Sequence, residues 1–215
     1  PLGNRGWSAL YTTSYQMVNI SISSGELFYD RISKFISDYV NSPNIQGPIA
    51  EANLSEFIAI WQSYKIMTKW IWHLFMHLET SVIKLNELLT LTAVALVHFH
   101  KFVYERYHDT LATLVLSSIQ REREGELVDR SLLQESLQNM DSALKLQEYN
   151  HLYLQHFEAN FLEETRKYYC RKSTEWLASM DIPAYILLLD AVMHQEDGRC
   201  TTYLNAVTHP KLMRV

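Results

Sequence analysis

The feature that most constrains this fold is an amphipathic run between Leu54 and Val82 that contains neither glycine nor proline. Its apolar side chains recur every three or four residues, which places them on one face of an α-helix. The chain of 215 residues has only six glycines and five prolines, so long helices are favoured over many short strands. A helix over this run would be about 40 Å long. The apolar positions are Leu54, Phe57, Ile58, Trp61, Met67, Ile71, Phe75, Leu78 and Val82.

Two helices are expected ahead of this run. The first covers about residues 7–20. The second begins after Ser24, which is a good N-cap residue, and ends before Pro43, because the residue that precedes a proline resists helical backbone. Residues 44–50, which include a Gly-Pro pair, are expected to form a loop.

Helical periodicity continues through the second half of the chain. A segment over residues 86–124 is expected to break near residues 104–108, where polar and aromatic residues interrupt the apolar stripe, and to end at Gly125 as a C′ residue. Further helices are predicted after Asp129 and after Asp181, with another long helix between them. No useful stretch alternates polar and apolar residues with period two, so the chain is predicted to be all-α.

Composition excludes several classes of protein. The formal net charge is −5, and no basic stripe exceeds a few residues, so nucleic-acid binding is not expected. The most apolar stretch, residues 88–97, is shorter than the roughly 20 residues that span a bilayer, so no membrane association is expected. Cys170 and Cys200 form no CxxC or Cys/His spacing, which indicates a reducing compartment without a disulfide framework.

Two ExxH pairs raise one alternative from a different class. Glu105 with His108, and Glu148 with His151, have the spacing that di-iron helical bundles combine with a glutamate from each of two other helices, and Glu79 is a candidate for one of these. Both pairs lie among polar residues, where such spacings are frequent on helix surfaces. A di-metal carboxylate bundle is therefore the remote alternative.

The sequence contains no catalytic constellation. His73 and His77 stand one helical turn apart, but the residues between them do not complete an HExxH motif and supply no general base. Glycine-rich phosphate loops and the GxSxG signature are missing as well. We therefore predict a protein that is not an enzyme and needs neither a metal nor a cofactor.

Five segments of the chain carry specific motifs, and together they cover about residues 7–212. The segments are LYTTSYQMV from residue 10, similar to LYxxxYxM; WQSYKIM from residue 61, similar to W-x-x-H/Y-K-x-M; REREGELVDRSLL from residue 121, similar to ERxGExxDRxLL; FEANFLEETRKYYCRKS from residue 157, similar to FExxFLxxTxxYYxxxS; and YLNAVTHPKL from residue 203, similar to YLxxSTxxKL. In this order they resemble motifs of the cullin family. The likeness is particularly to the cullin-1 class in its plant form, through LYTT, REREGE and YYxRKS.

The resemblance implies an elongated stack of cullin-type helical repeats, each covering the apolar face of its neighbour. Residues 7–125 would form a first repeat that lacks the usual first helix, and residues 126–215 a second repeat, complete or incomplete. Two family patterns are altered. The aspartate–arginine–tyrosine expected after the fourth helix reads LETS from residue 78, and FRDxV reads FHKFV from residue 99.

The resemblance also implies a function. Cullins are non-catalytic scaffolds of cullin-RING ubiquitin ligases, found in cytoplasm and nucleus, and this chain would dock a Skp-family adaptor with its F-box protein through the first repeat. It stops within the second repeat in this interpretation, so no binding of a RING subunit is expected, and a free-standing version could compete for adaptors. The alternatives are a BTB-type adaptor, whose class the YxMV segment from residue 15 also resembles, and another helical protein-interaction module.

The adaptor site implied by the resemblance lies on two helices of the first repeat. Residues spaced by three and four share a helix face, and Trp7 and Tyr11 match the family's adaptor-contacting aromatic positions. Core packing is the competing interpretation for an aromatic stripe, above all for Tyr15. The candidate residues are Trp7, Tyr11, Tyr15 and Val18 on one helix and Tyr107, Thr110 and Leu111 on the other.

Overall fold

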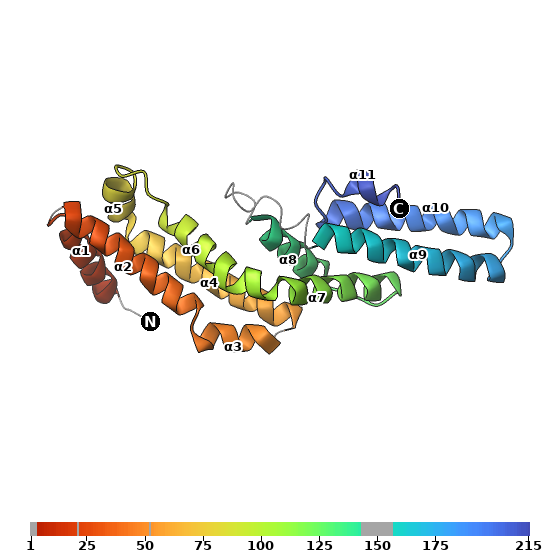
Figure 1. Ribbon diagram of the computed structural model, residues 1–215, viewed down its shortest axis with the longest axis horizontal. Coiled ribbons are helices and arrows are strands. Elements are labelled where there is room, and N and C mark those ends of the chain that lie inside the picture. Colours follow the sequence, from red (N-terminus) through yellow and green to blue (C-terminus); the bar gives the residue numbers. More distant parts are fainter. Residues whose placement is uncertain (1–3, 21, 52, 143–156) are drawn as a thin grey trace. The chain divides into compact units, whose positions relative to one another are not determined.

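The computed structural model describes residues 4–20, 22–51, 53–142 and 157–215, and within these ranges every regular element is helical (Figure 1). The chain divides into two compact units, unit 1 (Pro1–Tyr107) and unit 2 (His108–Val215). The all-α prediction is confirmed. The elements are α1 (Asn4–Val18), α2 (Ile22–Val40), α3 (Pro43–Glu51), α4 (Leu54–Leu74), α5 (Met76–Leu78), η1 (Glu79–Ile83), α6 (Leu91–Phe99), η2 (His100–Tyr104), α7 (Glu105–Arg123), α8 (Arg130–Ser142), α9 (Ala159–Ser179), α10 (Ile182–Tyr203) and α11 (His209–Leu212), where η marks a π-helical turn.

The long apolar run forms α4, but it does not remain one helix. Asn53 caps the start of α4: its side chain accepts the backbone N–H of Glu56 at 3.1 Å, and the Glu56 carboxylate accepts the N–H of Asn53 at 2.9 Å. The α-helix ends at Leu74, and the chain continues through α5 and η1. Periodicity predicted the buried face of α4 correctly at positions such as Phe57 and Trp61. The helix break at Phe75 could not be predicted in this way, because the apolar spacing continues across it.

Two predictions in the first half of unit 1 are wrong. Helix α2 begins at Ile22, so Ser24 lies inside it rather than at its N-cap. Residues 44–50 are not a loop but part of α3, which includes Pro48. The buried Gln46 explains this helix, because its side-chain amide donates to the carbonyl oxygens of Val40 at 2.9 Å and Phe102 at 3.1 Å. Such tertiary bonds override the local preference of proline for a break.

A close approach of two elements requires the glycine in α2. A Cβ atom added at Gly25 would lie 2.5 Å from Cγ2 of Val82 in η1, which is far inside van der Waals contact. Helix α2 can therefore pack this closely on η1 only because residue 25 has no side chain.

The segment predicted over residues 86–124 contains a local irregularity, but its position and form differ from the prediction. The interruption was expected near residues 104–108, but the structure has a π-helical turn, η2, at residues 100–104, and residues 105–108 already belong to the regular helix α7. Helix α7 ends as predicted at Gly125, whose φ is 89°. The N–H groups of Gly125 and Glu126 donate to the carbonyls of Glu122 and Arg121, which is the Schellman arrangement.

The predicted caps of unit 2 are also confirmed. A side-chain oxygen of Asp129 accepts the N–H of Ser131 at 2.9 Å at the start of α8, and Asp181 accepts the N–H of Ala184 at 3.0 Å at the start of α10. The boundary between the compact units falls inside α7, and the repeat boundary at residues 125 and 126 stays a prediction. No helix within the described ranges combines the length and apolar character needed to cross a membrane.

Candidate functional site

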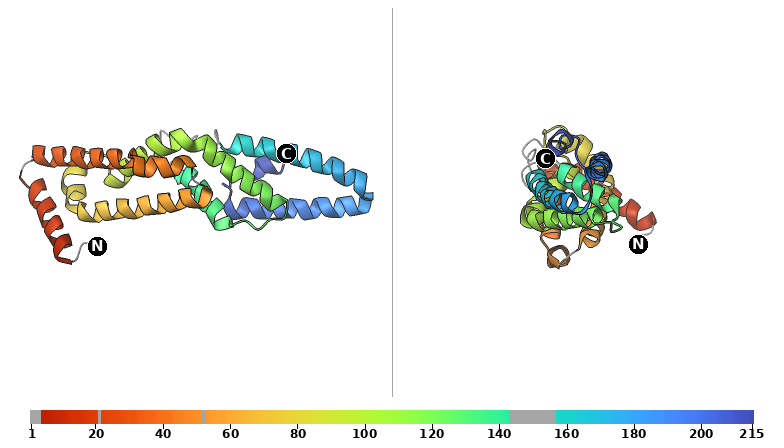
Figure 2. Two further views of the ribbon diagram at one scale, coloured as in Figure 1. Left: turned by 90° about the horizontal axis from the view of Figure 1, so that it is seen from below. Right: turned by 90° about the vertical axis from the view of Figure 1, so that its right-hand side faces the viewer.

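Helix α1 packs against α2, α4 and α5 of unit 1 and is inclined to α2 (Figure 2). The Trp7 ring makes an edge-on contact with Trp70 of α4, with centroids 5.1 Å apart. One helical turn after Tyr11, the ring of Tyr15 lies 4.4 Å from that of His77 in α5. The predicted aromatic face of α1 is therefore turned partly toward helices of its own unit.

Burial divides the predicted residues of α1. Val18 is only 6% exposed and belongs to the core of unit 1, which corrects its assignment to a docking face. Trp7 and Tyr11 are half-buried. Tyr15, for which core packing was the competing interpretation, is 47% exposed and remains available at the surface.

The predicted adaptor-binding residues of the second helix, Tyr107, Thr110 and Leu111, do not form one exposed face. The Tyr107 hydroxyl donates to the carbonyl of Gln46 at 3.4 Å, so within unit 1 it lies beside α3, whereas α1 lies beside α4 and α5 (Figure 1). Leu111 on α7 is only 4% exposed, which corrects its assignment to a docking face. Thr110 is exposed on α7, and its role in adaptor binding stays a prediction.

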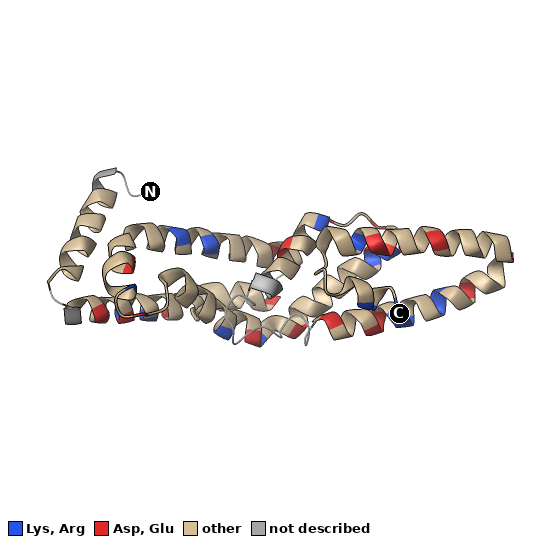
Figure 3. Cartoon of the chain, turned by 90° about the horizontal axis from the view of Figure 1, so that it is seen from above, with Lys and Arg blue, Asp and Glu red and all other residues tan. Residues whose placement is uncertain are grey.

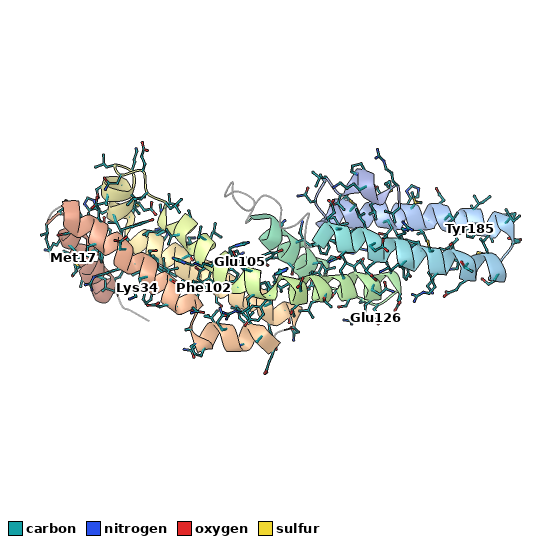
Figure 4. All side chains as sticks on the ribbon, viewed as in Figure 1. Met17, Lys34, Phe102, Glu105, Glu126 and Tyr185 are labelled. Atoms are coloured by element: carbon teal, nitrogen blue, oxygen red, sulfur yellow. The ribbon has the colours of Figure 1, made fainter. Side chains whose placement is uncertain are left out.

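Four exposed apolar residues were missed as site residues, and two of them lie inside the first motif. Leu10 and Met17 of α1 are 42% and 43% exposed. Figure 4 labels Met17 on α1. Ile66 and Trp70 of α4 are 59% and 56% exposed. A signal for the α4 pair was present in the sequence, because both residues fall outside the apolar stripe that forms the buried face of their helix.

In unit 2, motif residues of α7 and α9 meet two α10 residues outside the motifs, Glu196 and Arg199, in a buried ion-pair network. Two guanidinium nitrogens of Arg123 donate to the two carboxylate oxygens of Glu196, each at 2.9 Å. The same carboxylate accepts from Arg199 at 2.8 Å and from the hydroxyl of Tyr169 at 2.5 Å. Arg123 also donates to the Thr165 hydroxyl at 2.9 Å, so residues from α7, α9 and α10 share one charged cluster.

A second buried carboxylate, that of Glu122, belongs to the same region. It accepts the hydroxyl of Tyr203 at 2.9 Å and a guanidinium N–H of Arg130 at 2.8 Å. A third, Glu158, accepts the Thr208 hydroxyl at 2.9 Å.

The ammonium group of Lys211 also donates to Glu158. Glu122, Glu158 and the partners named for them lie in the last three family-like segments, as does Arg123, whereas Glu196 and Arg199 lie between the fourth and fifth segments. Those segments thus supply much, but not all, of the buried ion-pair network of unit 2.

Electrostatics reinforce this arrangement. Burial raises the pKa of the Glu196 carboxyl, but hydrogen bonding and positive charge from Arg123 outweigh burial and hold that pKa below the ordinary 4.5. Burial raises the pKa of the Tyr169 hydroxyl, and the charge of Glu196 raises it further. The carboxylate is therefore ionised and the phenol neutral at pH 7, as their hydrogen bond requires.

A groove of about 720 Å³ lies between α7 and α9 in unit 2. Its charged lining residues include Glu163, Glu164 and Lys167. The ammonium group of Lys167 lies 2.9 Å from Glu164 and 3.8 Å from Glu163. With Asp109, Arg123 and Arg171 the lining holds three acidic and three basic residues, so the groove offers no concentrated charge to a ligand.

The metal alternative gains no support from the part of the chain that the structure describes. No group of three or more His, Cys, Asp or Glu residues that could hold a metal occurs in it. Glu79 instead accepts the backbone N–H of Leu91 at 2.7 Å, at the start of α6. His77 contacts Asn19 as well as Tyr15. The pair Glu148 and His151 lies outside the described residues.

Comparisons with known proteins agree with the five motifs. A model of the cullin alpha solenoid domain matches residues 2–215. The putative cullin-like protein 2 of Arabidopsis thaliana is 29% identical over 210 residues, which are 95% of this chain and 55% of the relative. Cullin-2 of Arabidopsis thaliana is 29% identical over 214 residues, 95% of this chain and 28% of the relative. Cullin-1 of Oryza sativa subsp. japonica is 30% identical over 133 residues, 60% of this chain and 18% of the relative. The chain thus spans about half the length of the first of these relatives and less of the others.

Proposed function

Because the chain belongs to the cullin family, the scaffold family of ubiquitin ligases, we propose that unit 1 docks a Skp-family adaptor with its F-box protein through α1. The observation that carries this proposal is the exposure of the first motif. Leu10, Tyr15 and Met17 are motif residues, yet between 42% and 47% of each remains exposed. Exposed apolar residues in a family motif are better explained by a partner than by internal packing.

The chemistry of α1 suits protein docking. Tyrosine and methionine are enriched in the cores of protein interfaces, where charged residues are depleted. From Gly6 to Val18 the helix carries no charged residue, and Figure 3 shows this stretch without blue or red. Docking on α1 therefore requires little desolvation of charge in this chain.

We further propose that the chain is of the cullin-1 class, on the support of LYTT, REREGE and YYxRKS. In that class the partner is a Skp-family adaptor. A BTB-type adaptor is the second candidate, favoured only by the YxMV segment from residue 15. Delivery of a substrate to a ubiquitin ligase would need a RING-binding half, for which we assign no residues in this chain.

The test is size-exclusion chromatography of the purified chain with a Skp-family adaptor bound to an F-box protein and, separately, with a BTB protein. We expect co-elution with the first only. Tyr15→Ala should weaken adaptor binding by about 1–3 kcal/mol, as at an interface hot spot, with unchanged helical circular dichroism. Tyr11→Ala should act in the same direction.

Phe35→Ala is the matched control, because Phe35 on α2 is an aromatic residue with comparable exposure, 58%. It should leave adaptor binding unchanged. Co-elution with the BTB protein alone would replace the Skp-family assignment, and no co-elution with either would reject adaptor docking by this chain.

A further inference from the structure

A second apolar surface adjoins α1 on α4 of unit 1. Trp70 contacts Trp7, and Ile66 lies one helical turn before Trp70 on the same face of α4. Both α4 residues are more than half exposed. Together with Trp7 they form a row of large apolar side chains across two helices, which we call the α1–α4 surface.

Charge along this surface has one sign. Lys65 and Lys69 stand four residues apart on α4, next to Ile66 and Trp70 in sequence, and both are exposed. The only acidic residue of α4 is Glu56, in its first turn. Since α1 carries no charge from residue 6 to residue 18, the α1–α4 surface combines an apolar row with a basic edge.

The outer face of α2 provides a comparison within the same unit. It also exposes large apolar residues, Leu27 and Phe35, at 55% and 58%. There, however, the exposed basic residues Arg31 and Lys34 alternate with Asp30 and with further acidic residues. The α2 face therefore offers apolar contact without a preference for charge, whereas the α1–α4 surface offers both.

We propose that the α1–α4 surface binds an amphipathic helix whose polar side is acidic. An apolar helix face would cover Trp7, Ile66 and Trp70, which is the usual way in which an amphipathic helix docks. Acidic side chains beside that face would meet Lys65 and Lys69, and such complementarity sets specificity and association rate more than affinity. The inference rests on the proposed function in one respect: the adaptor module is the source of this helix.

The first arm of the test needs no adaptor. Two fluorescently labelled model helices share one leucine face, and their polar faces carry glutamate in one and lysine in the other. Fluorescence anisotropy should show binding of the glutamate peptide and at least tenfold weaker binding of the lysine peptide. The double variant Lys65→Glu/Lys69→Glu should reverse this preference.

A matched control keeps the change of net charge equal. Arg31→Glu/Lys34→Glu places the same reversal on α2 and should preserve the preference for the glutamate peptide. Trp70→Ala should lower the affinity for the glutamate peptide at least tenfold, as expected of an aromatic anchor. Circular dichroism of each variant should match that of the wild type. Equal binding of both peptides to the wild type, or no binding of either, would overturn the inference.

The second arm repeats the variants with the purified Skp-family adaptor and F-box protein. Weaker binding to Lys65→Glu/Lys69→Glu but not to the α2 double variant supports the inference. If the adaptor binds all variants equally, the proposed function stands and the α1–α4 surface is not part of its site. If the glutamate peptide binds but the adaptor does not bind even the wild type, adaptor docking fails while the acidic-helix surface stands.

Discussion

In unit 1 the family motif of α1 leaves three apolar side chains on the surface, whereas in unit 2 motif residues such as Arg123 and Glu122 have buried, paired side chains. Leu10, Tyr15 and Met17 are each more than 40% exposed. The motif residue Arg123, by contrast, retains only 4% exposure of its side chain, which lies 2.9 Å from the buried Glu196 of α10, a residue outside the motifs. Motifs of one family thus serve two purposes: those of unit 2 specify a fold, and the α1 motif of unit 1 offers a surface.

The largest expected effect is on the ion-pair network of unit 2. Glu196→Gln removes the carboxylate that pairs with Arg123 and Arg199 and leaves two buried guanidinium groups without its charge. Loss of one member of a buried pair costs about 3–5 kcal/mol. Guanidinium unfolding monitored by circular dichroism should show this loss.

Glu164→Gln is the control for that experiment. Its carboxylate pairs with Lys167 at 2.9 Å, but both side chains are more than half exposed. Exposed pairs contribute about 0–1 kcal/mol, so its unfolding should be close to that of the wild type. Equal effects of the two substitutions would show that the buried network does not hold unit 2 together.

Unit 1 should be most sensitive to packing rather than to charge. Gly25→Ala places a Cβ atom 2.5 Å from Val82, and such overpacking typically costs about 1–3 kcal/mol. Gly198→Ala in α10 of unit 2 has no heavy atom within 4 Å of the added Cβ and should stabilise the chain by up to about 1 kcal/mol. Thermal unfolding of both variants distinguishes them, and a stable Gly25→Ala variant would refute the close approach of α2 to η1.

Two glutamates, one in each unit, should respond to pH in opposite directions. Burial raises the pKa of Glu79 above 4.5, although the Leu91 N–H acts against it. Its contribution to stability is therefore present below pH 4.5 and is lost as pH rises through the folded-state pKa. The pKa of Glu196 is lowered, so its contribution is present above pH 4.5 and is lost as pH falls through the folded-state pKa.

Denaturant unfolding of the wild type, Glu79→Gln and Glu196→Gln over this pH range tests the sign of each effect. As pH rises, the wild type should lose stability relative to Glu79→Gln and gain it relative to Glu196→Gln. Parallel pH profiles for the two comparisons would contradict the opposite environments of these carboxylates.

Local signals made much of the fold predictable. Asp129, Asp181 and Gly125 act through bonds to residues two to four positions away, so the sequence alone identifies them as helix ends. Helix α3 was missed because bonds from Gln46 to Val40 and Phe102, the latter 56 residues away, stabilise it. Arg123 and Glu196 lie 73 residues apart in the sequence. Hydrophobic periodicity describes only local spacing, so it cannot predict that these two residues pair.

The sequence predicted that the candidate site lies on a helix, but it did not predict which side chains of that helix are exposed. Spacing placed Trp7, Tyr11, Tyr15 and Val18 on one face correctly, yet spacing cannot tell which face a neighbouring helix will cover. In the structure α4 and α5 cover part of it, so Val18 is buried while Met17 is exposed. Met17 could be recognised only once the packing of α1 was known.

The smallest effect on stability is expected for α1. Leu10→Ala and Met17→Ala alter exposed side chains, so the free energy of unfolding should change by no more than about 0.5 kcal/mol each. Differential scanning calorimetry measures this change. A much larger loss would mean that these side chains stabilise the core of unit 1.

The most direct test of the account is calorimetric titration of a Skp-family adaptor and F-box complex into two variants, one from each unit. Tyr15→Ala/Met17→Ala should lose at least tenfold in affinity while it unfolds like the wild type. Tyr203→Phe, which removes a hydrogen bond to the Glu122 carboxylate, should lose about 1.5–3 kcal/mol of stability but bind the adaptor normally. Normal adaptor affinity in the α1 variant, with its helices intact, would contradict the docking role of this motif.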